Sequence, residues 1–264
     1  MNDIVLATSA ADAEAVAAVE RHHAELAGSL VALAERVIGS AAGGSASAEA
    51  ARRDLVDWCE SELVPHALAE EKGMYPAAHA TTEGRLLVDS MLAEHVVIVD
   101  LVREVAEAST AVGAAAAARA LVVVFASHLA KENELVLPLL AAHPDVSVAG
   151  LLDGMHELLG GHGASEAAEA SEGGCGSHTC GCGEVDAPGH PVLDARAVPH
   201  SIRHATIFGA LDSVRPGEGL VLVAPHDPLP LLAQVHDRFS GAFETEYLER
   251  GPEAWRLVFL RRAA

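Results

Sequence analysis

The sequence of 264 residues has few aromatic and few basic residues. Phe, Trp and Tyr number five, two and two, and Lys plus Arg number 17 against 38 Asp plus Glu, which gives a formal net charge of −21. Phosphate backbones repel a chain this acidic, so we expect no nucleic-acid partner. Half of the residues are hydrophobic, which excludes wholesale disorder and suffices for a folded core.

Targeting signals and a disulfide framework are also lacking. The N-terminal stretch MNDIVLATSAADAEAVAAVE has no basic segment followed by an apolar one, so it is not a signal peptide. No run of about 18 apolar residues is free of charge or histidine, so we expect no membrane partner. The four cysteines are too few and too unevenly spaced to cross-link a chain of this length. We therefore expect a soluble, cytoplasmic protein.

Composition divides the chain into three zones. We predict a helical bundle at 1–145, a short helix followed by an acidic linker containing Gly, Cys and His at 146–190, and a small α/β domain at 191–264. The net charge is −13 over 1–150, −7 over 151–190 and −1 over the last zone. The linker includes GGHGASEAAEASEGGCGSHTCGCGE, a composition typical of flexible segments.

Apolar residues in the first zone recur at spacings of three and four, which predicts four amphipathic helices in an up-down, antiparallel four-helix bundle. The stretch 39–47 interrupts the pattern, with Ser47 as the predicted N-cap of the second helix. We expect that helix to stop near Pro76, and the fourth to begin after Gly113 and stop near Pro138. The four apolar stripes are Val16–Val37, Leu55–Glu70, Leu87–Val102 and Leu121–Leu135.

The last zone shows a different pattern, with short strand-like runs between helical ones. In roughly 74 residues it reads as a two-layer βαβαββ sandwich, so the whole chain is predicted to be a multi-domain protein of α and α/β classes. The expected elements are the strands PVLDAR, GLVLVAP, FETEYLE and AWRLVFLRR and the helices IRHATIFGALDSV and LPLLAQVHDRF.

Histidine is the abundant residue, with 15 copies. Each predicted bundle helix places one histidine on its apolar stripe, and two of these have a glutamate four residues later, on the same helix face. Burying four imidazoles and two carboxylates without a cation is costly. Such a mixed nitrogen and oxygen set suits iron, manganese or zinc, and two carboxylates in a bundle commonly hold two metals. The candidate metal ligands are His23, His66, Glu70, His95, His128 and Glu132.

At these residues the first zone resembles the hemerythrin-like family, also called the HHE cation-binding domain. The matching segments are ERHHAEL, VPHALAEEKGMYP, LAEHVVI and SHLAKENELVLP, within about residues 10–142. The resemblance implies two non-haem iron ions bridged by Glu70 and Glu132, with the four histidines as terminal ligands. The chain differs from oxygen-carrying members at Val99, where they have another histidine. This difference leaves oxygen, nitric oxide or iron sensing, or peroxide chemistry, as the expected roles.

The first helix offers two adjacent histidines, about 100° apart around the helix axis. His23 continues the apolar stripe better than His22, so we choose His23 as the ligand. Tyr75 lies just beyond the second-helix ligands. A place near the metals is one interpretation, and a packing residue at the end of the bundle is the one we favour.

The linker contains the cluster CGSHTCGC, with Cys175, His178, Cys180 and Cys182. Thiolates this close together are able to bind zinc or copper(I), to form a redox pair or to deliver metal to the bundle. The spacing is not that of a zinc finger, so an idle, reduced linker is the alternative interpretation.

The last zone resembles a bacterial family known only as domain of unknown function 2249, over about 192–262. The motifs on which this resemblance rests are RH from Arg203, HDPLPLL from His226, EYLE from Glu246 and GPEAWR from Gly251. The strand order is similar to that of small sulfur-carrier proteins, but this zone contains no cysteine, so sulfur transfer is not supported. The candidate functional residues are His204 and His226, and Asp227 is expected to cap the helix that follows.

These features predict a di-iron protein that binds or senses oxygen, nitric oxide or peroxide, coupled to the C-terminal module. The alternatives are an iron-handling or metal-delivery protein that uses the cysteine cluster, and a di-iron oxidase or peroxidase-like enzyme.

Overall fold

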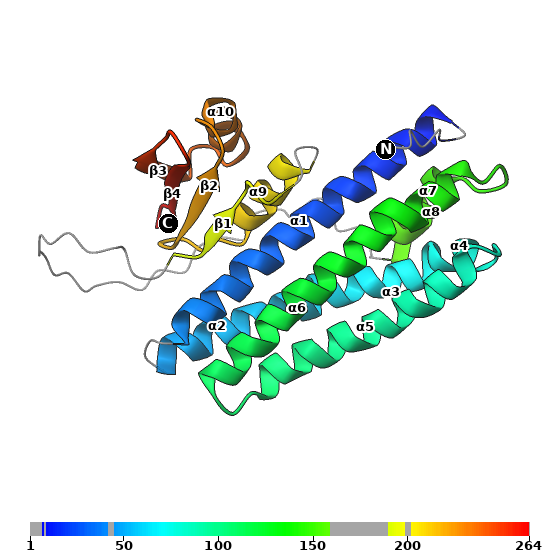
Figure 1. Ribbon diagram of the computed structural model, residues 1–264, viewed down its shortest axis with the longest axis horizontal. Helices are drawn as coiled ribbons and strands as arrows, with labels where there is room; N and C mark the ends of the chain where they lie inside the picture. The colour runs from blue at the N-terminus through cyan, green and yellow to red at the C-terminus, as the bar shows by residue number, and fades with distance from the viewer. Residues whose placement is uncertain (1–6, 8, 42–44, 159–189, 199–201, 264) are drawn as a thin grey trace, which may run out of the picture.

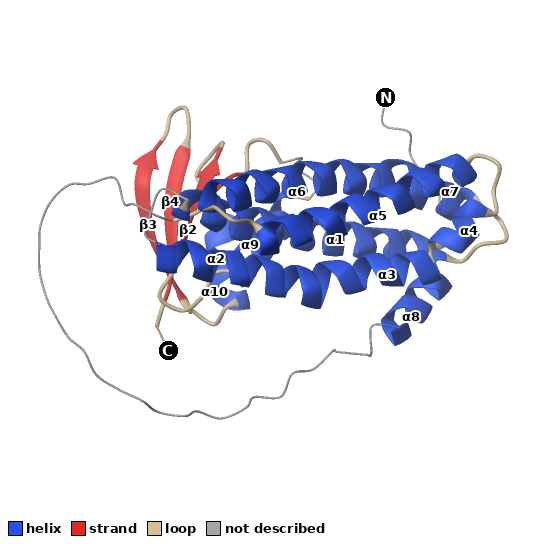
Figure 2. Cartoon of the chain, turned by 90° about the horizontal axis from the view of Figure 1, so that it is seen from below, coloured by secondary structure: helices blue, strands red, loops and turns tan. Residues whose placement is uncertain are grey.

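The computed structural model describes residues 7, 9–41, 45–158, 190–198 and 202–263. The N-terminal part is a helical region, and the C-terminal part is a small mixed sheet with two helices (Figure 1). The two parts meet along the first helix, and the sheet lies beside one end of the helical region (Figure 2).

Four long helical stretches lie in the N-terminal region, and each packs against at least two others. The first and third stretches lie on opposite sides of the region, because both contact the second and the fourth but share no major contact. The short helix expected at the start of the 146–190 zone is present as α8. The elements are α1 (Ala10–Ser40), α2 (Ser45–Trp58), η1 (Cys59–Leu63), α3 (Val64–Gly73), α4 (Tyr75–His79), α5 (Gly84–Glu107), α6 (Ala111–Lys131), η2 (Glu132–Val136), α7 (Leu137–Ala142) and α8 (Val148–Leu158).

The second helical stretch ends at Gly73, near Pro76 as expected, whereas the fourth does not stop at its proline. The fourth stretch continues through Pro138 to Ala142, so the prediction that it ends near Pro138 is wrong. The reason is the π-helical turn η2, in which the N–H of Leu137 bonds to the carbonyl of Glu132, five residues back. A wider turn accommodates a proline, which lacks an N–H and would clash with a carbonyl in a regular helix. The second stretch has the same device, because η1 directly precedes the turn containing Pro65.

Two helix starts also differ from expectation. Helix α2 begins at Ser45, so Ser47 lies inside it and is not its N-cap. Helix α6 begins before Gly113, because the Thr110 side chain accepts a hydrogen bond from the Gly113 N–H and caps the helix. Gly113 therefore lies in the first turn, where an N-capping threonine satisfies its backbone donor.

The C-terminal part has the predicted βαβαββ element order. The strands lie in the order β1-β2-β4-β3, with β1 parallel to β2 and the other pairs antiparallel. Alternate residues of β2 and β4, such as Leu222 and Leu257, share one apolar cluster with residues of both helices, such as Leu211 and Leu231. Both helices therefore cover the same face of the sheet. The elements are β1 (Val192–Asp194), α9 (Arg203–Asp212), β2 (Gly219–Ala224), α10 (Leu229–Arg238), β3 (Phe243–Arg250) and β4 (Trp255–Arg261).

Helix α9 crosses α1 at very short distance. A Cβ added to Gly28 would overlap the carbonyl oxygen of Thr206, and one added to Gly209 would overlap that of Glu25. Glycine on both helices is thus what allows the two backbones to touch. At the crossing, Ser29 Oγ donates a hydrogen bond of 2.8 Å to the carbonyl of Gly209.

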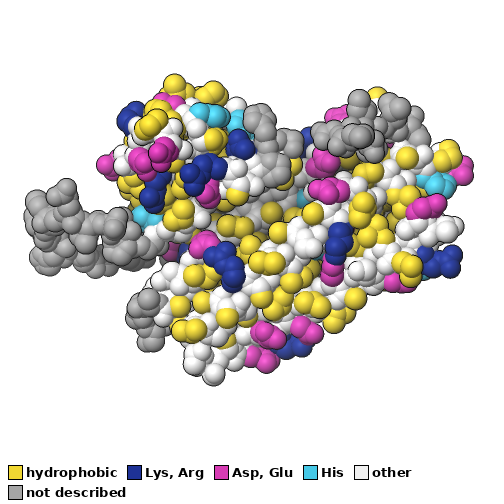
Figure 3. Space-filling model, viewed as in Figure 1, with side chains coloured by type: hydrophobic (Ala, Val, Ile, Leu, Met, Phe, Trp, Pro, Cys, Tyr) yellow, Lys and Arg dark blue, Asp and Glu magenta, His cyan; other side chains and the backbone are white. Residues whose placement is uncertain are grey.

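Ion pairs surround this crossing. Arg36 Nη2 lies 2.7 Å from Asp54 in α2 and 3.0 Å from Glu218 at the start of β2, and Arg215 also binds Asp54. Basic and acidic side chains adjoin on the C-terminal part in the space-filling view, and on the visible face of the helical region hydrophobic side chains are interspersed with charged ones (Figure 3). The contact between the two parts thus combines close backbone packing of α1 against α9 with ion pairs.

The stretch Ala111–Ala142 is long and apolar enough to cross a membrane by length and composition, with a mean hydropathy of 1.7 over its best window. It also contributes Leu121, Phe125 and Leu137 to the buried core. A core helix of a bundle passes the same test, so this helix by itself is weak support for a membrane span.

We predict that Gly28→Ala and Gly209→Ala each separate α9 from α1. The added methyl has to displace backbone rather than a flexible side chain, so the free energy of unfolding should fall by about 1–3 kcal/mol. Thermal or denaturant unfolding measures this change, and hydrogen exchange should show faster exchange in α9.

The matched control is Gly39→Ala in the same helix α1, where an added Cβ meets nothing within 4 Å. This change should be neutral or stabilising, since alanine favours helix. Equal stability of the Gly28→Ala and Gly39→Ala variants would contradict the close crossing.

Candidate metal centre

The six residues selected from the sequence lie together in the middle of the helical region. All are buried, with exposed fractions between 0% and 5%. They form a polar layer between two apolar clusters: Leu26 and Leu63 belong to one, and Val19 and Met91 to the other. The residues of this layer are His23 from α1, His66 and Glu70 from α3, His95 from α5, His128 from α6 and Glu132 from η2.

Glu70 faces histidines from three helices. Its Oε1 lies 2.8 Å from His66 Nε2 and 3.2 Å from His23 Nε2, and its Oε2 lies 3.6 Å from His95 Nε2. The two oxygens therefore point to different histidine groups, as expected of a carboxylate that bridges two ions.

Glu132 lies between His23 and His128. Its Oε2 lies 3.7 Å from His23 Nε2 and 3.6 Å from His128 Nε2. Its other oxygen accepts a hydrogen bond of 2.6 Å from the hydroxyl of Tyr75, which also lies 3.4 Å from the Nε2 atoms of His95 and His128. Tyr75 is therefore part of the polar layer and not only a packing residue. Its hydroxyl could not be assigned to the site from sequence, because a single tyrosine at a helix end has no spacing signal.

Three histidines are oriented by side chains behind them. His23 Nδ1 lies 2.8 Å from the Asn133 amide oxygen. His95 Nδ1 lies 2.8 Å from Glu71, and His128 Nδ1 lies 3.2 Å from Glu94. With the Nδ1 proton donated outward, the Nε2 lone pair of each ring faces the centre, which is the arrangement a metal ligand needs.

The geometry fits metal ions. The donor atoms of His23, His66 and Glu70 all lie within 4.8 Å of one another, and so do those of Glu70, His95 and His128. Among the described residues, His66 Nε2 and Glu132 Oε2 are buried and form no well-aligned hydrogen bond. Buried polar atoms without such a partner are costly, and a cation would satisfy both. Two triads that share one carboxylate would hold two ions close together.

The pKa values show how strongly the layer attracts positive charge. Burial lowers the pKa of His23, but its hydrogen bond to Glu70 and the charge of Glu132 outweigh burial and raise it to about 9. Burial and the nearby Glu70 raise the pKa of Glu132 to about 8. Burial also lowers the pKa of His128 to about 4, which keeps its ring neutral. Without a metal, the layer compensates its carboxylates by holding protons.

Comparison with known families agrees with this geometry. Residues 14–140 match the family model described as "Hemerythrin HHE cation binding domain", and residues 192–261 match the one described as "Uncharacterized conserved protein (DUF2249)". The chain carries a hemerythrin HHE domain followed by a DUF2249 domain. No curated protein and no solved structure matches the chain.

Burial distinguishes the two adjacent histidines of the first helix. His23 is buried, whereas His22 is exposed and packs its ring edge against that of His66, with 4.9 Å between ring centroids. Val99 is 37% exposed. Position 99 therefore lies off the buried face of α5, and the layer receives one residue of this helix, His95, among those described.

The other candidate residues lie elsewhere. Cys175, His178, Cys180 and Cys182 fall outside the described residues. In the DUF2249 domain, His204 and His226 are both exposed, and neither belongs to the buried HHE layer.

Asp227 does not cap the helix that follows it. Helix α10 begins after Pro228 without a side-chain cap, and the Asp227 carboxylate accepts a hydrogen bond of 2.6 Å from the hydroxyl of Tyr247. The guanidinium of Arg250 lies over the Tyr247 ring, 3.6 Å from its centroid. The expectation of a cap is wrong because β3 brings a phenol within reach of this carboxylate.

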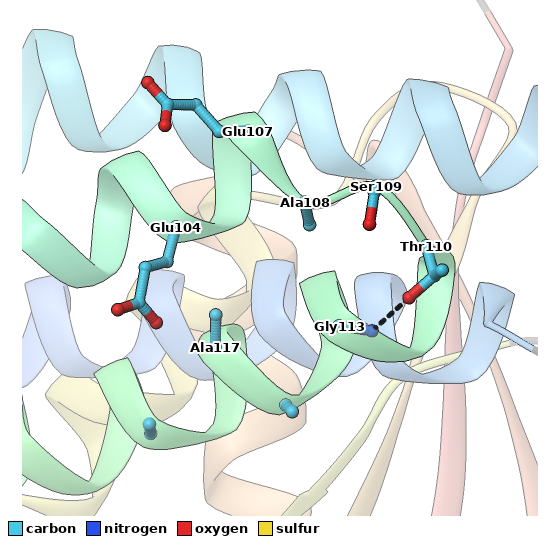
Figure 4. Close-up of a pocket in the computed structure, with 9 residues that line it drawn as sticks. Glu104, Glu107, Ala108, Ser109, Thr110, Gly113 and Ala117 are labelled. Atoms are coloured by element: carbon cyan, nitrogen blue, oxygen red, sulfur yellow. Dashed lines mark hydrogen bonds between the residues drawn. The ribbon is translucent and has the colours of Figure 1, made fainter.

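A separate hollow of about 500 Å³ lies at the turn between α5 and α6 (Figure 4). Glu104 and Glu107 line it together with alanines and Thr110. Glu104 is nine residues from His95, roughly 14 Å along the helix axis, so the hollow is distinct from the HHE layer. Its lining contains no histidine and no cysteine, and the Thr110 hydroxyl caps α6, so we do not treat the hollow as a candidate active site.

We predict that metal binding to the HHE domain strengthens between pH 7 and pH 9. His23 and Glu132, with pKa values of about 9 and 8, are protonated at pH 7 in the metal-free protein. Metal binds only their deprotonated forms, so binding at pH 7 should release about two protons, and the apparent affinity should rise until both groups lose their protons unaided. Calorimetric titration in buffers of different ionisation enthalpy measures the release. Affinity that falls over this range would contradict the assignment.

Proposed function

We propose that this chain is a non-haem di-iron protein that binds oxygen, nitric oxide or peroxide and transmits the bound state to its C-terminal domain. The observation that carries the proposal is the pair of buried triads that share Glu70. In the proposed centre, within a four-helix up-down bundle, Glu70 and Glu132 bridge two irons. The terminal ligands are His23, His66, His95 and His128.

The donor set is compatible with iron. The layer offers imidazole nitrogens and carboxylate oxygens and no thiolate among its described members, a set that suits iron, manganese or zinc. The match to the HHE family model supports the binding of a cation. Two irons held by these residues would supply open positions at which a small ligand binds. The apolar clusters on both sides of the layer limit access to small molecules.

The route to the C-terminal domain is helix α1. It carries His23, and about one and a half turns later it carries Gly28 and Ser29, which contact α9 directly. A shift of His23 on ligand binding therefore moves the backbone on which the second domain rests. The strong acidity of the chain supports a cytoplasmic protein that meets neither nucleic acid nor membrane.

We predict that His66→Ala and Glu132→Ala each lose metal. Each removes a donor that has no other well-aligned partner among the described residues, so bound iron per chain should fall by at least half. Metal analysis after anaerobic loading with iron(II) measures the loss, and absorption spectra before and after exposure to air report the response to oxygen.

The matched control is His79→Ala. His79 is a histidine of the same region, but it is 44% exposed at its side chain and pairs with Asp89 on the surface. Unchanged iron content in both His66→Ala and Glu132→Ala would refute the proposed centre. Steady turnover of peroxide by the iron-loaded protein would favour a peroxidase-like enzyme over a sensor.

The coupling has its own expected outcome. Binding of nitric oxide to the iron-loaded protein should change hydrogen exchange in α9. In Gly209→Ala this change should disappear while iron content stays the same, because the added methyl breaks the contact with Glu25 and not the centre. The change should persist in Gly39→Ala. An identical response in Gly209→Ala and the wild type would refute transmission through α1.

A further inference from the structure

The four histidines of the layer differ in the side chains that lie behind their rings, on the side away from the centre of the layer. The two triads divide them into a pair, His95 and His128, and a second pair, His23 and His66. Each pair contributes two imidazoles, and Glu70 belongs to both triads. The histidine and glutamate donors are thus balanced between two metal positions, and the Tyr75 hydroxyl lies on the side of His95 and His128. Any further difference must come from the surroundings.

The pair His95 and His128 is backed by carboxylates. Glu71 accepts from His95 Nδ1 at 2.8 Å, and Glu94 accepts from His128 Nδ1 at 3.2 Å. Lys131, one turn after His128, forms an ion pair with Glu94 and holds that carboxylate in place. Two carboxylates therefore stand directly behind this pair of imidazoles, and one of them is shared with Lys131.

The pair His23 and His66 has no such backing. The partner of His23 Nδ1 is the neutral amide oxygen of Asn133, at 2.8 Å. Among the described residues, Glu70 of the layer itself is the carboxylate that pairs with His66. The ring of His66 is also contacted edge-on by the ring of His22. Among the described residues, no carboxylate outside the layer forms a hydrogen bond or a close ion pair with these two imidazoles, and Glu20 acts on His23 through its charge alone.

A carboxylate that accepts the Nδ1 proton makes the imidazole a stronger donor at Nε2. Such outer partners typically change metal affinity 10–100-fold, because they fix the ring and increase its basicity. A neutral amide fixes the ring but adds little negative charge. With first donors balanced, this difference is sufficient to rank the two positions.

We propose that the two metal positions are inequivalent, and that the position of His95 and His128 fills first because Glu71 and Glu94 strengthen its ligands. Glu71 and Glu94 are thereby assigned as positioning residues, which act on the metal through the histidines. The inference rests on the proposed dinuclear centre and adds an order of loading to it.

The test is an anaerobic titration of the full-length, metal-free protein with cobalt(II), followed by absorption. The wild type should bind two cobalt ions in two resolved steps. Glu71→Gln and Glu94→Gln keep the size and an acceptor oxygen but remove the charge, so each should weaken the tighter step about 10–100-fold and leave the weaker step unchanged.

The reverse change provides a gain that structural damage would not produce. Asn133→Asp puts a carboxylate behind His23 and should strengthen the weaker step, drawing the two steps together. To assign the steps, His95→Ala should remove the tighter one and His66→Ala the weaker one. The matched control is Glu104→Gln, which removes the same charge from α5 ten residues beyond Glu94, and both steps should be unchanged.

Two results would overturn the inference, and they are distinguishable. Two cobalt ions that bind with equal affinity, or a Glu71→Gln variant that weakens both steps equally, would refute the inequivalence and leave the dinuclear centre intact. Failure of the wild type to bind a second cobalt ion would refute the dinuclear centre itself, and with it the order of loading.

Discussion

The structure depends on one constraint: six ionisable side chains have to be buried together in the middle of a bundle. Glu70 and Glu132 are almost fully buried, and burial of a carboxylate is tolerated only when cations, protons or donors surround it. Histidines from α1, α3, α5 and α6 supply that environment. The helices are therefore held in register by the polar layer, while the apolar clusters on either side provide the stabilising burial.

The position of the polar layer is related to the two π-helical turns. The π-helical turns η1 and η2 each lie beside a ligand pair, one before His66 and one beginning at Glu132. A wide turn shifts the residues that follow it around the helix axis, so it adjusts where a side chain points. The same turns accommodate Pro65 and Pro138. One local device thus serves chain continuity and the orientation of the centre.

Helix α1 joins the two halves of the molecule. One face carries Leu30 and Leu33 into the core and His23 to the layer, and Gly28 on another face lies against α9. Because these residues belong to one continuous helix, a displacement at the centre and a displacement at the domain contact are not independent. The two glycines at the crossing keep the domains close enough for such a displacement to matter.

The sequence by itself determined which six residues meet in the buried layer and most of the elements. Periodic spacing is local information, so the stripes that contain His23, His66, His95 and His128 were visible without coordinates, as was the βαβαββ order. Spacing also distinguished His23 from His22. What it did not reveal was Tyr75, the partners Asn133, Glu71 and Glu94, and the contact of α1 with α9. These interactions join residues far apart in the chain, and no period connects them.

Only the tertiary structure decided how the helices pass their prolines, which residues stand behind each histidine and which face of α1 the second domain covers. The physical reason is that each outcome depends on packing between elements. A proline stops an isolated helix, but a π turn held by its neighbours allows the chain to continue through Pro138. Likewise, Asp227 has the local character of a cap, and it bonds Tyr247 because the sheet brings that hydroxyl to it.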